Sequence, residues 1–290
     1  MESINIFCFG FGQVAKNFIK KIQSENFKFN LSTTSRDLTK KNEINKIKFI
    51  SYQFNEKNFD SNLIDSLKKA DHILISIPPI NGEDLVVKNF SNIIKNSKPK
   101  WITYLSATSV YGNHNGEWVD EKSKCLPSSE KGKSRLKAEN SWLDLGSKNI
   151  PVQIFRLSGI YSNNNNVLTR LKAGKVNLVS KKNHFFSRIH VEDIANILLK
   201  SLTNFKSGEI FNISDDKPSS STEVTLYGAK ILNVDIPKKI EVNEIESEML
   251  KSFYKDSKKV SNKKMKIFFN YKLKFPTYEE GLNNIRNDFV

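Results

Sequence analysis

The chain has 290 residues, of which 38% are hydrophobic, so it can bury the core of one large α/β domain or of one domain and a smaller lobe. No apolar run reaches the roughly 18 residues of a membrane span, and the chain opens on a strand-like sequence, so we expect a cytoplasmic protein without a membrane partner. The net charge of +15 comes from lysines scattered in ones and twos without interleaved aromatic residues, which favours solvated faces over nucleic-acid binding. Cys8 and Cys125 lack metal-ligand spacing, and no metal site is predicted.

The first predicted unit, from Ile4 to Lys20, is a short apolar strand, a turn through two glycines and an amphipathic helix. In a dinucleotide-binding βαβ unit, Gly10 permits the sharp turn, Gly12 leaves room for a pyrophosphate, and Ala15 lets helix and strand pack closely. The phosphates would then bind the main chain of the turn and the first helical residues, Gly10, Gly12, Gln13 and Val14. An ordinary strand-to-helix turn is the alternative.

The second strand is predicted over Phe27–Thr33, and Thr34, Ser35 and Arg36 follow it. Proteins that prefer NAD usually place a carboxylate at the end of this strand, where it binds the ribose 2′-hydroxyl. Here hydroxyls and a guanidinium stand instead, and these groups suit a 2′-phosphate. We therefore predict NADP rather than NAD as the cofactor. The alternative is that Arg36 simply opens a surface loop.

Alternating strands and helices continue through the first half of the chain. Strands are predicted at 46–52, 71–77 and 101–105, and helices at 60–70 and 83–96. The nearly continuous apolar strand at 71–77 is typical of a parallel sheet that is covered on both faces. Ligands of such sheets bind at the carboxyl ends of the strands, so we place Ser76, Ile77, Pro78 and Ser106 at the cofactor site.

From Tyr104 to Glu121 the sequence resembles the strand-end segment of extended short-chain dehydrogenases/reductases, the NAD-dependent epimerase/dehydratase or nucleoside-diphosphate-sugar epimerase group. It is most similar to the atypical members. Further resembling segments lie in the same order, at 150–161, 186–195, 208–218 and 275–282. The resemblance implies an α/β fold, a Rossmann-type doubly wound parallel sheet with a smaller C-terminal substrate lobe. We expect an NADP-binding domain over residues 1–160 and a lobe interleaved with returning core elements over 161–290.

The family's reaction centre is a Ser or Thr and a Tyr-x-x-x-Lys pair, in which the phenol exchanges a proton with a substrate alcohol. Gly132, Ser134 and Glu139 fix the register of the family pattern on this chain. All three catalytic positions then differ from the family, because they hold Ala107, Lys131 and Arg135.

The substituted residues are the candidate catalytic groups. Arg135 can hydrogen-bond a ribose but cannot exchange a proton, and Lys131 could act as an acid or base only if its pKa were depressed. Thr108 carries a nearby hydroxyl that should point away from the face of Ala107 unless the chain turns there. Tyr111 is either a substitute phenol near the substrate or a core residue.

Two further residues are candidates for substrate contact. The position that Arg188 resembles often faces a substrate phosphate in sugar-nucleotide enzymes, and the alternative is an ion pair with Glu192 or Asp193. His190 precedes a helix predicted at 191–203. It either acts in catalysis or caps that helix from a packed position. Beyond these, a mobile polar loop is predicted at 163–166, a helix at 222–232 and a charged surface helix within 244–264.

The sequence thus favours an NADP-binding, epimerase/dehydratase-like homologue, an oxidoreductase that would act on a small or nucleotide-linked substrate with altered catalytic groups. The alternative is a non-catalytic NADP-binding sensor or scaffold, which the loss of all three catalytic side chains favours. A nucleic-acid partner would rest on charge alone. Because homologues of this fold often pair through helices, a homodimer is one assembly to expect.

Overall fold

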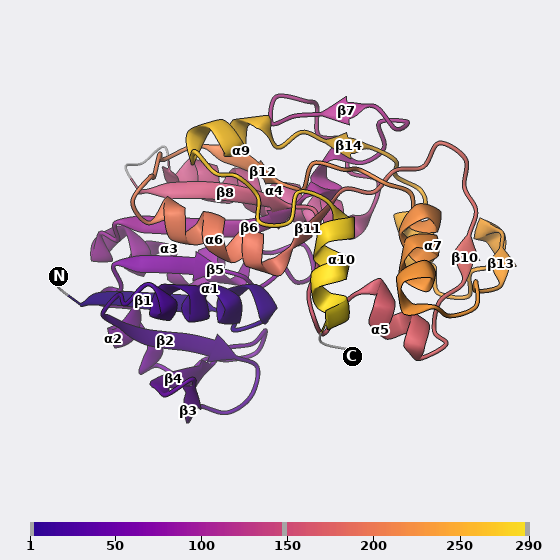
Figure 1. Ribbon diagram of the computed structural model, residues 1–290. Coiled ribbons are helices and arrows are strands. Elements are labelled where there is room, and N and C mark those ends of the chain that lie inside the picture. Colours follow the sequence, from indigo (N-terminus) through magenta and orange to yellow (C-terminus); the bar gives the residue numbers. More distant parts are fainter. Residues whose placement is uncertain (1–2, 147–149, 288–290) are drawn as a thin grey trace. The chain divides into compact units, whose positions relative to one another are not determined.

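A mostly parallel sheet of eight strands organises the chain, as a computed structural model of residues 3–146 and 150–287 shows (Figure 1). The strand order is β12-β8-β6-β5-β1-β2-β4-β3, and β3 pairs antiparallel with β4. This confirms the predicted Rossmann-type α/β fold. The strands are β1 (Ile4–Phe9), β2 (Phe29–Ser35), β3 (Lys40–Ile44), β4 (Ile47–Gln53), β5 (His72–Ile75), β6 (Trp101–Ala107), β8 (Val152–Leu157) and β12 (Ile210–Ile213).

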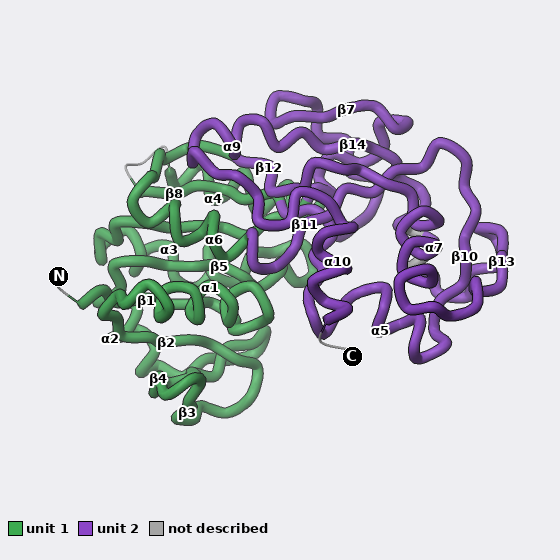
Figure 2. The backbone as a smooth tube through the Cα atoms, in the orientation of Figure 1, with its two compact units in different colours: residues 1–107, 133–156, 194–210 green, residues 108–132, 157–193, 211–290 purple. Residues whose placement is uncertain are grey.

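The chain divides into two compact units that are each built from three segments (Figure 2). Unit 1 comprises residues 1–107, 133–156 and 194–210, and unit 2 comprises residues 108–132, 157–193 and 211–290. The helices that run wholly or largely in unit 1 are α1 (Gln13–Ser24), α2 (Leu63–Lys68), α3 (Leu85–Ser97), α4 (Glu130–Gly146) and α6 (Val191–Ser201).

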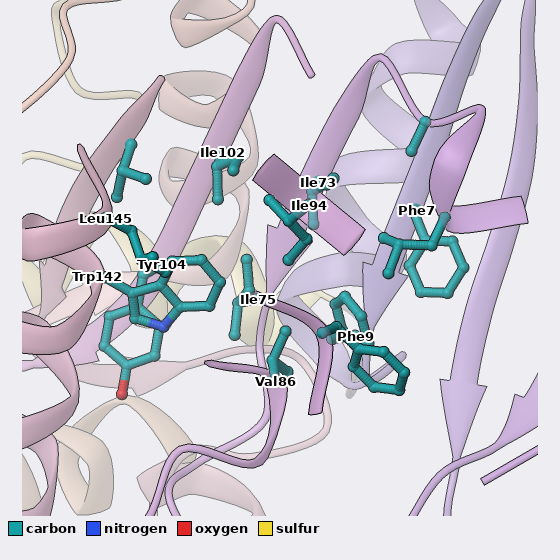
Figure 3. Close-up of a cluster of buried hydrophobic side chains, with 14 of the residues drawn as sticks. Phe7, Phe9, Ile73, Ile75, Val86, Ile94, Ile102, Tyr104, Trp142 and Leu145 are labelled. Atoms are coloured by element: carbon teal, nitrogen blue, oxygen red, sulfur yellow. The ribbon is translucent and has the colours of Figure 1, made fainter. Parts of the chain in front are cut away.

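The core of unit 1 lies between the sheet and the helices α2, α3 and α4 (Figure 3). Phe9 stacks on Phe90 of α3 with ring centroids 5.5 Å apart, and Trp142 of α4 lies over Tyr104 of β6. The indole of Trp142 also donates a 3.0 Å hydrogen bond to Asp84, which N-caps α3. Full burial of each such side chain contributes about 1.5–3 kcal/mol, so these aromatic contacts fix the helices to the sheet.

Unit 2 is built from short elements around a second hydrophobic cluster, whose members include Tyr161, Leu168, Val224 and Leu282. Its two-stranded ladders are β9 with β11, β10 with β13, and β7 with β14. Its elements are η1 (Thr108–Tyr111), β7 (Trp118–Val119), β9 (Gly159–Tyr161), α5 (Val167–Lys172), β10 (Leu178–Val179), β11 (Arg188–His190), α7 (Ser221–Leu232), β13 (Lys239–Ile240), η2 (Val242–Glu244), α8 (Glu248–Phe253), β14 (Lys259–Val260), α9 (Lys263–Phe268) and α10 (Tyr278–Arg286).

Several predicted elements differ from the structure. The second strand lies two residues later than predicted, and the strand β3, which forms a hairpin with β4, was missed. The predicted helix within 244–264 is wrong: the segment holds η2, α8, β14 and the start of α9. Ser257 interrupts it, because its N–H and hydroxyl bind Asn113 and Asn183 instead of continuing a helix.

The polar run 163–166 is not an open loop. Ser162 and Asn165 exchange main-chain hydrogen bonds, and the buried Asn166 N-caps α5 by accepting the N–H of Thr169 at 3.0 Å. An asparagine side chain therefore starts a helix where the composition suggested mobility. Over the residues that the structure describes, no helix is long and apolar enough to cross a membrane.

Candidate dinucleotide-binding site

The glycine turn joins β1 to α1 at the carboxyl edge of the sheet in unit 1. Gly10 has φ +83°, and a Cβ there would lie 2.7 Å from Cγ2 of Ile77 and 2.9 Å from Oγ of Ser76. Only glycine fits such a position without strain. Around Gly12, by contrast, no atom of the described residues lies within 4 Å of an added Cβ. The turn is thus closed on the side of β5 and open at Gly12.

Two neighbouring strands hold this turn in place. The hydroxyl of Thr34, at the end of β2, accepts the N–H of Gly10 at 2.9 Å. The hydroxyl of Ser76, just after β5, lies 3.0 Å from the carbonyl of Phe9 and 3.1 Å from that of Gly10, and donates to them. Thr34 is only 2% exposed, so its hydroxyl supports the turn from inside the protein.

The start of α1 faces the open side of the turn. Gly12 is its N-cap and has no side chain to accept a helical N–H, and the first turn contains no acidic residue. Val14 and Ala15 are buried against the sheet, while Gln13 is exposed. Main-chain donors at the positive end of a helix, without a local carboxylate, form a suitable place for a phosphate.

The end of β2 is polar, and part of it is accessible. Ser35 is half-buried and donates to the carbonyl of Asp37, and Arg36 is exposed. The amide of Asn55 donates to the carbonyl of Arg36 at 3.4 Å. Asp37, which was not among the predicted cofactor residues, is exposed and places a carboxylate one residue beyond Arg36. At the end of β5, Ile77 is half-buried and Pro78 is exposed.

The predicted catalytic positions belong to different units. In unit 1, Arg135 of α4 donates a 2.7 Å hydrogen bond to the carbonyl of Leu105 in β6. Ser106 follows; it is 2% exposed, and its hydroxyl has no hydrogen-bond partner among the described residues. In unit 2, the side chain of Lys131 is exposed and Thr108 is half-buried. The chain does turn at this point, because η1 begins at Thr108.

Tyr111 and Arg188 are both held within unit 2. The Tyr111 hydroxyl donates to Oδ1 of Asn212 at 2.8 Å, and the residue is fully buried. Arg188 forms no ion pair with Glu192 or Asp193. Its Nη1 donates instead to the carbonyls of Phe186 and Ser219, at 3.0 and 2.9 Å. Burial lowers its pKa, and the nearby Asp215 opposes that change. Asp193 instead accepts hydrogen bonds from Tyr271, Lys274 and Phe275.

His190 is fully buried between two aromatic rings, with ring centroids 5.0 Å from Tyr161 and 4.3 Å from Phe275. Its Nδ1 accepts the N–H of Glu192 at the start of α6, at 3.3 Å. Burial lowers its pKa to about 4. This placement supports the packed, helix-capping alternative for His190.

The comparisons with known proteins agree with this architecture. Residues 85–214 match the NAD dependent epimerase/dehydratase family. A functionally unknown conserved protein from Silicibacter pomeroyi is similar in structure, with 28% identity, 99% coverage of both chains and a TM-score of 0.86. The predicted resemblance is confirmed.

More distant structures show the same fold. A dTDP-glucose 4,6-dehydratase from Bacillus anthracis, solved in complex with NAD, has 17% identity, a TM-score of 0.79 and coverage of 99% of this chain and 96% of its own. A UDP-N-acetylglucosamine 4-epimerase from Bacillus cereus has 16% identity, a TM-score of 0.76 and coverage of 98% and 99%. No curated protein sequence matches the chain. At these identities the likeness shows the fold alone.

Proposed function

We propose that this chain is an NADP-binding homologue of the epimerase/dehydratase family, and that unit 1 binds the dinucleotide at the carboxyl edge of its sheet. The observation that carries the proposal is the turn at Gly10 and Gly12, which Thr34 and Ser76 hold in front of α1. It combines a glycine at a positive φ that other residues could not adopt without strain, an open approach at Gly12 and a helix N-terminus without acidic residues. These features together suit a pyrophosphate.

Each part of the edge has a proposed role. The main chain at Gly12, Gln13 and Val14 would bind the phosphates. Ser76, Ile77, Pro78 and Ser106 would line the path of the dinucleotide along the strand ends, and Arg135 would hydrogen-bond its nicotinamide-side ribose. When bound, the nicotinamide would supply a hydride donor or acceptor.

We propose NADP over NAD because of the residues that follow β2. The Ser35 hydroxyl and the exposed Arg36 offer donors for a 2′-phosphate, and bidentate guanidinium–phosphate pairs are strong. Asp37 supports the opposite choice, since a carboxylate could accept hydrogen bonds from the ribose hydroxyls of NAD. The distantly related dehydratase was solved with NAD. The preference therefore depends on whether Arg36 or Asp37 contacts the ribose.

A titration with NADPH and NADH tests both the site and the preference. We expect Arg36→Ala to weaken NADPH binding about tenfold, which corresponds to about 1.4 kcal/mol, and to change NADH binding less than about twofold. Asp37→Ala is the matched control, because it removes the neighbouring exposed charge. If Asp37→Ala weakened NADH binding and Arg36→Ala had no effect on NADPH, the preference would be reversed. If neither cofactor bound, the site itself would be refuted.

For the chemistry, we propose an oxidoreductase that acts on a small or nucleotide-linked substrate, with Lys131, Arg135 and Thr108 as the catalytic groups and Arg188 as a substrate contact. Tyr111 and His190 were also predicted near the substrate, but both are fully buried and held by other contacts, which favours their packed alternatives. A non-catalytic sensor is the second candidate. A specific observation favours it: Arg135 is tied to Leu105, and the Tyr111 phenol to Asn212. Tight NADPH binding without hydride transfer to any member of a panel of nucleotide sugars and small carbonyl compounds would favour the sensor.

A further inference from the structure

Arg135, which stands at the position of the family's catalytic lysine, is anchored at the carboxyl end of β6. Its guanidinium donates a 2.7 Å hydrogen bond to the carbonyl of Leu105. A guanidinium has five N–H donors, so one hydrogen bond does not fix its orientation. A second contact is needed to aim the group at a cofactor.

Tyr104 directly precedes Leu105, and its ring packs against the helix that carries Arg135. Arg135 and Trp142 are seven residues apart on α4, and residues at that spacing lie on one face of a helix. The ring of Trp142 stacks on that of Tyr104, with centroids 6.2 Å apart (Figure 3). The face of α4 that carries Arg135 therefore packs on Tyr104.

The Tyr104 hydroxyl is a buried polar group close to this guanidinium. The residue is fully buried, and its hydroxyl has no well-aligned hydrogen bond with any described residue. Burial raises the pKa of the phenol, and Arg135 opposes this change both as a nearby cation and as a hydrogen-bond donor. The guanidinium is thus within reach of the hydroxyl. Because the phenol stays protonated near neutral pH, it can accept a hydrogen bond but does not exchange a proton.

Asp84 holds the two aromatic rings from the side of α3. Its Oδ1 accepts two N–H groups in the first turn of α3, and its Oδ2 accepts the indole N–H of Trp142 at 3.0 Å. Burial raises the pKa of this carboxyl, while its hydrogen bonds and the charge of Arg135 oppose the change. Asp84 therefore fixes Trp142 on Tyr104 and places a negative charge near the guanidinium.

We propose that Tyr104 is a positioning residue of the dinucleotide site, whose hydroxyl accepts a hydrogen bond from Arg135 and aims the guanidinium at the nicotinamide-side ribose. A buried hydroxyl without a partner is costly, and Arg135 is the donor placed to satisfy it. This inference rests on the proposed function, in which Arg135 contacts that ribose. Tyr104 is fully buried and acts only through Arg135.

The test compares NADPH with adenosine 2′,5′-bisphosphate, a fragment of the cofactor that lacks the nicotinamide ribose. We expect Tyr104→Phe, which keeps the ring on Trp142, to weaken NADPH binding about fivefold and binding of the fragment less than about 1.5-fold. In the Arg135→Met background the same substitution should change NADPH binding less than about 1.5-fold, because the hydroxyl has lost its partner. Tyr52→Phe is the matched control. It removes another buried hydroxyl of unit 1, which lies 2.7 Å from Oγ of Ser66, and should leave both affinities unchanged.

Three results would overturn the positioning role. Equal weakening of NADPH and of the fragment by Tyr104→Phe would mean that the hydroxyl supports the fold in general. An unchanged NADPH affinity would mean that Arg135 needs no second contact. An effect that persisted in the Arg135→Met background would mean that Tyr104 acts through another group.

Failure of the proposed function gives a different result. If the unsubstituted chain bound neither NADPH nor NADH, the dinucleotide site itself would be refuted, and the positioning role with it. If the chain preferred NADH, the same comparison would be made between NADH and adenosine 5′-diphosphate, with the same expected differences for Tyr104→Phe.

Discussion

The glycine turn of unit 1 and the catalytic positions around β6 and α4 contrast sharply. The turn combines a glycine at a positive φ, an open approach at Gly12 and a helix N-terminus without acidic residues. Its contacts involve main-chain groups of Phe9 and Gly10. The catalytic positions depend on side-chain chemistry, and all three hold other residues than the family pattern. A site built from main-chain groups needs only small residues that allow the required backbone conformation. A site built from side chains changes its chemistry whenever one of those side chains is replaced.

The largest expected effect is a difference in stability between alanine variants of the two glycines in the turn. Gly10→Ala should lower the free energy of unfolding by about 2–4 kcal/mol, because a Cβ is strained at φ +83° and overpacks against Ile77 and Ser76. Gly12→Ala should change the free energy of unfolding by less than about 1 kcal/mol, since the space around Gly12 is open. The added methyl group would occupy the space proposed for the pyrophosphate, so we expect NADPH binding to weaken at least about tenfold. Denaturant unfolding and cofactor titration of both variants measure these differences. Equal losses of stability would contradict the division of roles between the two glycines.

Sequence reasoning could predict this turn because its requirements appear as residue types. A glycine at a positive φ and small residues at close contacts leave a pattern that can be recognised in one sequence. The role of Thr34 could not be predicted in the same way. It was expected to face a 2′-phosphate, whereas its hydroxyl accepts the N–H of Gly10. Which way a side chain at a strand end points depends on the strand boundary, and β2 lies two residues later than predicted.

The motif pattern predicted the position of Glu139 but not its partner. Glu139, one of the residues that fixed this register, is fully buried and forms a bidentate pair with Arg156 at 2.7–3.1 Å. A buried carboxylate requires such a partner, so the glutamate at this motif position has a structural role. The partner lies 17 residues away on β8, however, and nothing local in the sequence indicates it.

The regions that sequence reasoning missed are those held by distant polar contacts. The carbonyl of Ser257 accepts hydrogen bonds from the N–H groups of His114 and Gly116, and its hydroxyl accepts one from the N–H of Phe185. These contacts join three loops of unit 2 and break the helical pattern that the charged segment 244–264 suggested.

A pH experiment on His190 tests whether the proposed substrate residues of unit 2 are sealed in the core. Its folded pKa of about 4 lies below the unfolded value of about 6.5, so the unfolded chain takes up a proton first as the pH falls. Stability should therefore decrease from about pH 6.5 to pH 4, and at pH 5 this residue should account for about 2 kcal/mol. His190→Phe keeps the ring contacts with Tyr161 and Phe275 but removes the titration.

The measurement is the free energy of unfolding at pH 7 and at pH 5. His72 and His184 also have a pKa lowered to about 4 by burial, so they provide a constant background in both proteins. The difference between the two pH values should be about 2 kcal/mol smaller in the variant. An unchanged difference would mean that the folded pKa of His190 is close to its unfolded value. His190 would then be a candidate catalytic group again.

The smallest expected effect concerns the substituted centre itself. Arg135→Lys restores the family residue and removes a single 2.7 Å hydrogen bond to Leu105, so stability should fall by at most about 1 kcal/mol. Both side chains carry a cation with donors for a ribose, and we expect NADPH affinity to change less than about threefold. Arg135→Met, which lacks the charge, should weaken it about tenfold. If Arg135→Lys instead abolished binding, the guanidinium would be an essential part of the cofactor site, and its presence at this position would mark an adaptation to binding rather than a loss of catalysis.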